Sequence, residues 1–192
     1  MGLGESMLMW GTKPRPRSLA LIGGGTHAAV VREIIALIGR DIIVGIVDDA
    51  LSEGPYGESL LGTRAVLPHL RGIYIFDVVM AIGDNQARRT LYLLAIAHGL
   101  TPRTVIHPSA VISPSATIGP GTVICAHAVV GSYARVGANV LLNTACTVDH
   151  HCVIGDHAHL APGVHLGGGV MVPEGVLVPI GRSVPPNRTV VV

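Results

Sequence analysis

Residues 111–154 read VISPSATIGPGTVICAHAVVGSYARVGANVLLNTACTVDHHCVI, and the spacing of the large aliphatic residues in this stretch decides the fold. Every sixth residue is Ile, Leu or Val, and the series extends beyond both ends of the stretch. Its members are Ile106, Ile112, Ile118, Ile124, Val130, Val136, Leu142, Val148, Ile154, Leu160, Leu166, Val172, Val178, Val184 and Val190. An unbroken period over the second half of the chain indicates a structural repeat.

A second series of small or β-branched residues stands four positions after the first. Its members are Ala110, Ala116, Thr122, Ala128, Ala134, Val140, Cys146, Cys152, Ala158, Val164, Val170 and Val176, and it fails at Arg182 and Arg188. A period of six fits neither a helix nor a plain strand, but it fits a coil of short strands joined by tight turns. We predict that the large aliphatics stack inside the coil and that the small residues fill its corners. The alternative, an all-β sandwich with accidental spacing, is disfavoured by the length of the series.

The first half of the chain alternates short apolar runs with segments of helical spacing. Apolar runs occupy residues 18–22, 42–47 and 77–82, and helical spacing occupies residues 30–38 and residues 85 to about 98. This alternation predicts a small parallel α/β domain. The expected organisation is a disordered leader over residues 1–17, the α/β domain over residues 18–103 and the repeat domain over residues 104–192.

A glycine-rich turn joins the first apolar run to the first helical segment. Such a turn offers backbone N–H groups and a helix N-terminus to a phosphate, so Gly23, Gly25, Thr26 and His27 are candidate substrate-binding residues. The acidic pair Asp48-Asp49 follows the second apolar run and is a candidate for binding ribose hydroxyls. A tight turn without a ligand and an NAD-binding domain are the alternatives. The domain has roughly half the length of a full dinucleotide fold, which favours a mononucleotide such as the UDP of a nucleotide sugar.

Composition narrows the possible partners. The formal net charge is +1 at pH 7 and aromatic residues are few, so neither nucleic acid nor a membrane surface is expected as a partner. No apolar run is long enough to span a bilayer, and residues 1–17 lack the order of a secretory signal. Cys125, Cys146 and Cys152 have no CxxC spacing, which predicts reduced, buried thiols and a cytoplasmic location.

Several motifs from both halves occur together in one known family. They are Gly23 to His27, Asp48-Asp49, Ala81-Ile82-Gly83-Asp84-Asn85 with Arg88, Asn143-Thr144, Val148-Asp149-His150, Gly155-Asp156-His157-Ala158-His159 and Ala161-Pro162-Gly163. In combination they resemble the bacterial hexapeptide-repeat sugar acyltransferases, which include sialic acid O-acetyltransferases and UDP-4-amino-sugar N-acetyltransferases. The resemblance covers residues 18 to about 176. It implies a Rossmann-like mononucleotide-binding domain followed by a left-handed parallel β-helix, assembled as a homotrimer.

The resemblance also implies the site residues. His150 matches a general base and Asp149 the acidic residue that orients it, while Asn143, His159 and Gly168 match positions that bind acetyl-CoA. Gly168 is expected to aim its backbone N–H at the thioester oxygen, and no metal is implied. From residue type alone, a solvated corner histidine at position 150, packing at a subunit seam for His159 and a plain turn glycine at position 168 are the alternatives. His151 follows the base, and we expect it to point to the other side of the strand.

The expected activity is direct transfer of an acetyl group from acetyl-CoA to a sugar, most closely a UDP-linked 4-amino sugar. O-acetylation of sialic acid is the close alternative, since no residue distinguishes an amine acceptor from a hydroxyl. A zinc hydratase of the γ-carbonic anhydrase type and a non-catalytic β-helix binding protein are alternatives of other classes. The crowded histidines that suggest zinc are His150, His151, His157, His159 and His165. The α/β domain argues against zinc, and the Asp149-His150 pair argues against a non-catalytic protein.

The end of the repeat departs from the family pattern. Members of the family usually add further coils after the region that corresponds to residues 167–169. Here the series of small residues stops after Val176, and prolines follow at positions 179, 185 and 186. Weaker CoA binding and a shortened chain are both open.

Overall fold

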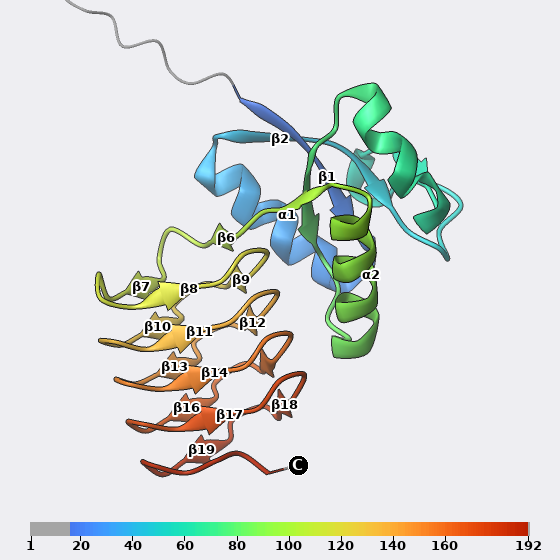
Figure 1. Cartoon of the computed structure of the whole chain (residues 1–192). Helices are drawn as coiled ribbons and strands as arrows, with labels where there is room; N and C mark the ends of the chain where they lie inside the picture. Colours follow the sequence, from blue (N-terminus) through green and yellow to red (C-terminus); the bar gives the residue numbers. More distant parts are fainter. Residues whose placement is uncertain (1–15, 192) are drawn as a thin grey trace, which may run out of the picture.

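The computed structural model describes residues 16–191 and consists of an α/β unit beside a regular coil (Figure 1). The last strand of the α/β sheet ends at Pro102 and the first strand of the coil begins at Val105. The leader expected over residues 1–17 lies outside the described residues except at its last two positions, and Arg17 already belongs to the first strand. None of the helices within residues 16–191 is both long and apolar enough to cross a membrane.

Five parallel strands form the sheet of the α/β unit in the order β3-β2-β1-β4-β5. They are β1 (Arg17–Ile22), β2 (Asp41–Val47), β3 (Leu60–Gly62), β4 (Asp77–Met80) and β5 (Thr101–Pro102). The chain runs outward from β1 to β3 and then returns to the other side of β1 as β4, so the strand order reverses beside β1. Ligands of open parallel sheets bind outside the carboxyl ends of the strands at such a reversal. The sequence predicts β1, β2 and β4, but it does not predict β3 or β5.

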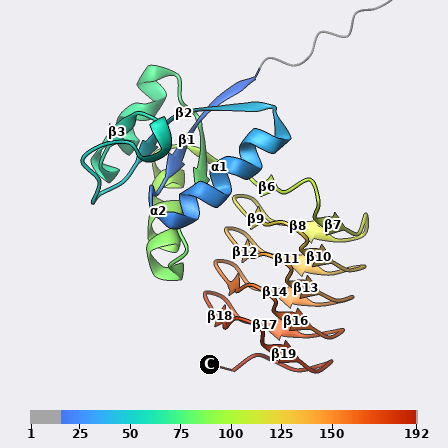
Figure 2. The same ribbon diagram turned by 180° about the vertical axis from the view of Figure 1, so that it is seen from behind.

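Helices cover both faces of this sheet (Figure 2). They are α1 (Thr26–Ile38), α2 (Asn85–Ala97) and two 3₁₀ helices, η1 (Pro55–Gly57) and η2 (Arg64–Ile73). Because side chains alternate along a strand, β1 contributes to two separate cores. Leu19 and Leu21 pack on the α1 side, and Ala20 and Ile22 pack on the side of α2 and η2.

The second half is a left-handed parallel β-helix, in which each strand has two residues and pairs with the strand one coil later, as Val129 pairs with Thr147. The β6 face contains β6 (Val105–Ile106), β9 (Val123–Ile124), β12 (Leu141–Leu142), β15 (His159–Leu160) and β18 (Leu177–Val178). The β7 face contains β7 (Val111–Ile112), β10 (Val129–Val130), β13 (Thr147–Val148), β16 (His165–Leu166) and β19 (Ser183–Val184). The β8 face contains β8 (Thr117–Ile118), β11 (Arg135–Val136), β14 (Val153–Ile154) and β17 (Met171–Val172).

The predicted ladder of aliphatic side chains fills the inside of the coil. From Ile124 to Val190 every sixth residue is buried, and Ile106, Ile112 and Ile118 are partly buried against the same core. The small residues fill the corners, where Cys146 and Cys152 are fully buried. The coil also continues past Val176, where the series of small residues stops. Arg182 and Arg188 are exposed there while Val184 and Val190 remain buried, so the backbone pairing persists without small corner residues.

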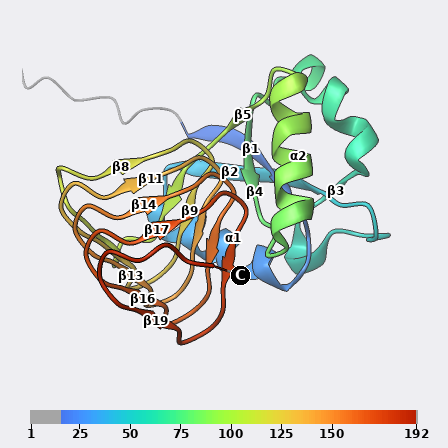
Figure 3. The same ribbon diagram turned by 60° about the horizontal axis from the view of Figure 1, so that its bottom comes forward.

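The α/β unit rests on the β6 face. Outward-facing Val105, Val123 and Leu141 share one buried cluster with α1 and β1. Figure 3 looks along the coil and shows the α/β unit on one side of it, whereas the corner that joins β13 to β14 lies on the side away from α1 and α2. The β13–β14 corner is therefore remote from the α/β unit of its own chain.

Arg88 of α2 links the α/β unit to the coil through hydrogen bonds. Its side chain is 2% exposed, and its guanidinium donates to the carbonyl oxygens of Asn139, His157 and Ala158 in the coil. The same group donates to the carbonyl oxygens of residues 82 and 83 and to the Asn85 side chain, at the end of β4 and the start of α2. Burial lowers the pKa of Arg88 to about 10, and the nearby Asp84 carboxylate opposes this shift, so the group is charged at neutral pH.

We predict that Arg88→Met lowers the free energy of unfolding by about 2–4 kcal/mol, because several buried carbonyl oxygens lose a donor together. Denaturant unfolding measures the change. The control is Arg89→Met, which removes an ion pair to Glu174 whose two side chains are about half exposed and which costs less than about 1 kcal/mol. Equal stability of the two variants would contradict the role of Arg88.

Candidate functional site

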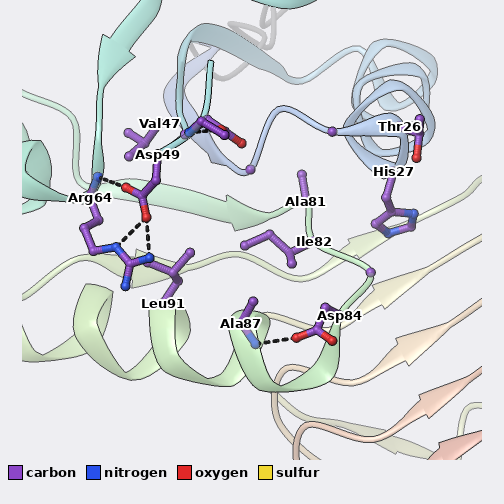
Figure 4. Close-up of a pocket in the computed structure, with 15 residues that line it drawn as sticks. Thr26, His27, Val47, Asp49, Arg64, Ala81, Ile82, Asp84, Ala87 and Leu91 are labelled. Atoms are coloured by element: carbon purple, nitrogen blue, oxygen red, sulfur yellow. Dashed lines mark hydrogen bonds and ion pairs between the residues drawn. The ribbon is translucent and has the colours of Figure 1, made fainter. Parts of the chain in front are cut away.

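A pocket of about 480 Å³ opens at the carboxyl ends of β1, β2 and β4, where the strand order reverses (Figure 4). All six residues that the sequence predicts to bind the substrate line it, namely Gly23, Gly25, Thr26, His27, Asp48 and Asp49. Arg64 and Leu91 also line the pocket and were not predicted. Arg64 begins η2, a segment whose sequence carries no recognisable motif.

The three glycines of the turn have different roles. Gly23 has φ +99°, and a Cβ there would come within 2.5 Å of the Ile82 side chain. A Cβ on Gly24 would come within 2.4 Å of Leu51, whereas a Cβ on Gly25 would meet no atom within 4 Å. Gly23 is thus required by its backbone conformation, a side chain at Gly24 would require Leu51 to move, and Gly25 borders the open space of the pocket.

The N-terminus of α1 faces this pocket without a side-chain cap. Its N-cap residue is Gly25, and its first turn contains no acidic residue. The first N–H groups of a helix lack partners within the helix, and together with the helix dipole they attract an anion. The start of α1 is therefore suited to a phosphate group.

All three acidic residues that line the pocket are already engaged. Asp84 lies at the start of α2, where it accepts a hydrogen bond from the backbone N–H of Ala87 at 2.7 Å. Asp48 accepts hydrogen bonds from the backbone N–H groups of Gly24 (2.8 Å), Ala50 (2.8 Å) and Leu51 (3.2 Å), so it fixes the glycine turn. Asp49 accepts hydrogen bonds from the backbone and side chain of Arg64, which hold the pKa of Asp49 below its usual range. Asp48 thus shapes the pocket, and Asp49 with Arg64 forms a charged pair at its rim.

His27 lies at the opposite end of the pocket from the Asp49–Arg64 pair (Figure 4). Its Nε2 atom is buried and has no hydrogen-bond partner within residues 16–191. Burial, with a smaller contribution from the positive charge of Arg88, lowers the pKa of His27 to about 4. His27 is therefore a neutral imidazole at physiological pH.

His159 and Asn143 lie on the coil close to His27. The Asn143 side-chain N–H donates to Nε2 of His159 at 3.3 Å, with Nε2 then unprotonated. Burial lowers the pKa of His159 to about 4, assisted by the charge of Arg88 and by the charge that His27 acquires when it is protonated, and opposed by the Gly83 carbonyl. The structure thus brings together two predicted acetyl-CoA residues and one predicted substrate residue, all uncharged.

A second cluster occupies the β13–β14 corner and contains Asp149, His150 and His151. The His150 ring lies against Gly168 of the next coil, where a Cβ would come within 2.4 Å of the imidazole Cε1. The Asp149 carboxylate accepts a hydrogen bond from the backbone N–H of His150 at 2.6 Å, so it holds the backbone of the corner. Only a glycine at position 168 leaves room for the observed position of the ring.

The expectation that His151 points away from His150 is wrong. The two Nδ1 atoms are 3.1 Å apart, and the two rings meet edge to face. Strand alternation does not apply at this position, because β13 ends at Val148 and His151 has a left-handed backbone with φ +59°. The turn folds the two histidine side chains toward each other.

The two clusters are not in contact within one chain. His27 is the second residue of α1 and His159 belongs to β15 of the β6 face, on which the α/β unit rests, whereas His150 belongs to the β13–β14 corner. Figure 3 shows that this corner lies on the side of the coil away from α1 and α2. Among residues 16–191 no group of three or more His, Cys, Asp or Glu side chains is placed to hold a metal ion. Burial raises the pKa of Cys125 to about 11 and of Cys146 to about 12, so these thiols stay protonated.

Similar solved structures extend over almost the whole chain. The acetyltransferase domain of PglB from Neisseria gonorrhoeae FA1090, in complex with acetyl coenzyme A, is 33% identical with a TM-score of 0.79, over 91% of this chain and 95% of that one. PerB from Caulobacter crescentus, in complex with CoA and GDP-perosamine, is 32% identical with a TM-score of 0.69, over 91% and 88%. The family model described as PglD N-terminal domain matches residues 18–93. No curated protein matches the chain.

The neutral histidines predict a loss of stability in acid. The folded-state pKa values of His27 and His159 lie near 4, below the unfolded value of 6.5, so the unfolded chain binds more protons between these limits. The free energy of unfolding is therefore expected to fall as the pH drops from about 6.5 to 4, by about 1–3 kcal/mol for each histidine.

Denaturant unfolding across this pH range tests the prediction. The double variant His27→Gln, His159→Gln is expected to lose less stability in acid than the parent chain. Both proteins have the same carboxylates, so the difference between them reports the two histidines. Identical slopes for the two proteins would show that neither histidine is held neutral by the fold.

Proposed function

We propose a substrate for this chain, which belongs to the bacterial hexapeptide-repeat sugar acyltransferases and is itself an acyltransferase. It acetylates a nucleotide-linked amino sugar with acetyl-CoA. The observation that carries the proposal is the pairing, in one chain, of a phosphate-suited pocket with a histidine packed on a glycine of the next coil. The acetyl coenzyme A bound to PglB supports the acetyl donor, and the GDP-perosamine bound to PerB supports a nucleotide-linked acceptor. The sequence resemblance favours a UDP-linked 4-amino sugar, whereas PerB is bound to GDP-perosamine.

The nucleotide is assigned to the pocket of the α/β unit. Its phosphates would be bound by the N–H groups at the start of α1, next to Gly25, Thr26 and His27. The Asp49–Arg64 pair lies at the end of the pocket opposite His27, and the nucleoside part of the substrate would reach it there. The sugar ring is assigned to the end of the pocket near His27, where His27 and the nearby His159 are neutral and Asp84 is the charged side chain on the pocket wall.

The chemical step is assigned to the β13–β14 corner. The sugar nitrogen attacks the thioester carbon, its proton passes to His150, and the carbon–sulfur bond breaks to release the CoA thiol. The backbone N–H of Gly168 has no hydrogen-bond partner within residues 16–191 and would donate to the oxyanion that forms on the thioester carbonyl. The Asp149 carboxylate beside the ring favours the imidazolium that results.

A complete site requires a second chain. The pocket and His150 lie on different sides of one coil, so the sugar held in one chain would meet His150 of a neighbour. A three-sided coil has flat faces that suit cyclic closure, and we assign the assembly as a homotrimer with acetyl-CoA bound between neighbours. Asn143 and His159 of the first chain and Gly168 of the second would then line one groove.

Release of the CoA thiol from acetyl-CoA tests the proposed function. The acceptors to compare are UDP- and GDP-linked 4-amino sugars, the free sugars and sialic acid. Turnover that requires the nucleotide-linked amine is the expected result. Turnover with sialic acid alone would replace N-acetylation with O-acetylation, and the absence of thiol release with every acceptor would contradict the proposal.

We predict that His150→Ala lowers kcat by about 10²- to 10⁴-fold with little change in acetyl-CoA binding, because a positioned base typically contributes that factor. Asp149→Asn is expected to lower kcat less, since it keeps the base and removes only the neighbouring charge. Steady-state kinetics with thiol detection measures both. Unchanged kcat in His150→Ala would exclude it as the base.

We predict that Gly25→Val raises KM for the nucleotide sugar about tenfold or more and leaves KM for acetyl-CoA nearly unchanged. The added side chain meets no protein atom within the reach of its Cβ and so occupies the pocket rather than disturbing the fold. Gly72→Val in η2 is the control, since a Cβ there also meets open space but lies outside the pocket. Equal increases in both KM values would place the nucleotide elsewhere.

A further inference from the structure

The hydrogen bonding of the His150 ring sets it apart from an ordinary surface histidine. Within residues 16–191 the one hydrogen bond that its imidazole makes joins its Nδ1 to Nδ1 of His151, at 3.1 Å. The Asp149 carboxylate is bonded to the backbone N–H of His150 and makes no hydrogen bond with the ring. The partner that orients the ring is therefore a second imidazole.

His151 is itself held in place from two sides. Its backbone N–H donates to the carbonyl oxygen of Ser132, one coil earlier, at 2.9 Å. Its ring stacks on Tyr133 with centroids 5.3 Å apart and planes inclined by 31°. The left-handed backbone at position 151 then turns the Nδ1 edge toward His150. The His151 acceptor is thus fixed by contacts that do not depend on His150.

From this geometry we propose that His151 is a positioning residue for His150, an inference that rests on the proposed role of His150 as the base. A hydrogen bond between two Nδ1 atoms contains one proton, so one ring donates and the other accepts. A base that takes a proton at Nε2 must carry its own proton on Nδ1. His150 therefore donates its Nδ1–H to the unprotonated Nδ1 of His151, and its Nε2 lone pair is held beside Gly168.

The hydrogen bond between the two histidine rings stays in place throughout the proton transfer. When Nε2 of His150 takes the proton from the attacking amine, both nitrogens of His150 carry protons, and the Nδ1–H donation to His151 becomes charge-assisted. No proton leaves His151 and none is added to it. The proton then returns from Nε2 to the departing thiolate, and the neutral pair is restored.

The contact holds a single proton between the two Nδ1 atoms, because two N–H groups at this distance would face each other. The other charged or titratable groups that face the pair are Asp149 beside it, Tyr133 against the His151 ring and Arg135 across a hollow that His151 also lines. His151 thus supplies a neutral acceptor at a position where a carboxylate would supply an anionic one.

A substitution series at position 151 separates the acceptor from packing. His151→Phe keeps a ring against Tyr133 and removes the acceptor, and it is expected to lower kcat roughly 10- to 100-fold because the base loses its orientation. His151→Asp restores an acceptor with a negative charge, and short acidic residues tolerate the left-handed backbone. It is expected to recover most of kcat and to move the acid limb of the pH–rate profile upward by about one to two pH units.

His127→Phe is the matched control, because His127 is also an exposed histidine at a left-handed corner of the coil (φ +57°) and should leave kcat unchanged. Thermal unfolding of each variant excludes loss of the fold. Full kcat in His151→Phe, or an unshifted acid limb in His151→Asp, would overturn the pairing. A low kcat in His150→Ala would in that case still support His150 as the base. Full kcat in His150→Ala would overturn the base and the pairing together.

Discussion

Stacking of the aliphatic ladder is the constraint on which the rest of the molecule depends. Because every coil buries the same inward positions, each coil superposes on the next, and every corner is held at a fixed height along the axis. The His150 corner therefore lies directly over the Gly168 corner, where the absence of a Cβ makes room for the ring. A loop on an ordinary surface would not hold a ring and a backbone N–H in such a relation.

The second constraint is the attachment of the α/β unit to the β6 face. A buried apolar patch and the Arg88 guanidinium fix the end of β4 and the start of α2 against the coil. The rim of the pocket is part of the same hydrogen-bond network, because the carbonyl oxygens of residues 82 and 83 accept from Arg88, so the pocket is positioned relative to His159. It follows that a ligand in the pocket would have a fixed direction relative to the faces of the coil.

Much of this could be predicted from the sequence, because a ladder residue must be buried whatever surrounds it. The glycine turn and the Asp48–Asp49 pair could be placed by their spacing, although not the backbone contacts that occupy Asp48. The elements η1, β3 and η2, between residues 55 and 73, could not be predicted because they have no period and depend on contacts such as that of Asp49 with Arg64. The direction of His151 was missed because a left-handed turn, not a strand, sets it.

The central claim is that each site takes its pocket from one chain and its base from the next. Mixed oligomers of His150→Ala chains and Gly25→Val chains test it most directly, at a sugar concentration low enough that each parent retains about a tenth of the activity or less. In a randomly mixed trimer roughly a quarter of the sites combine an intact pocket with an intact neighbouring histidine, so activity should return to about that fraction of the unmodified protein. Mixed trimers no more active than their parents would show that the pocket and His150 serve the same chain.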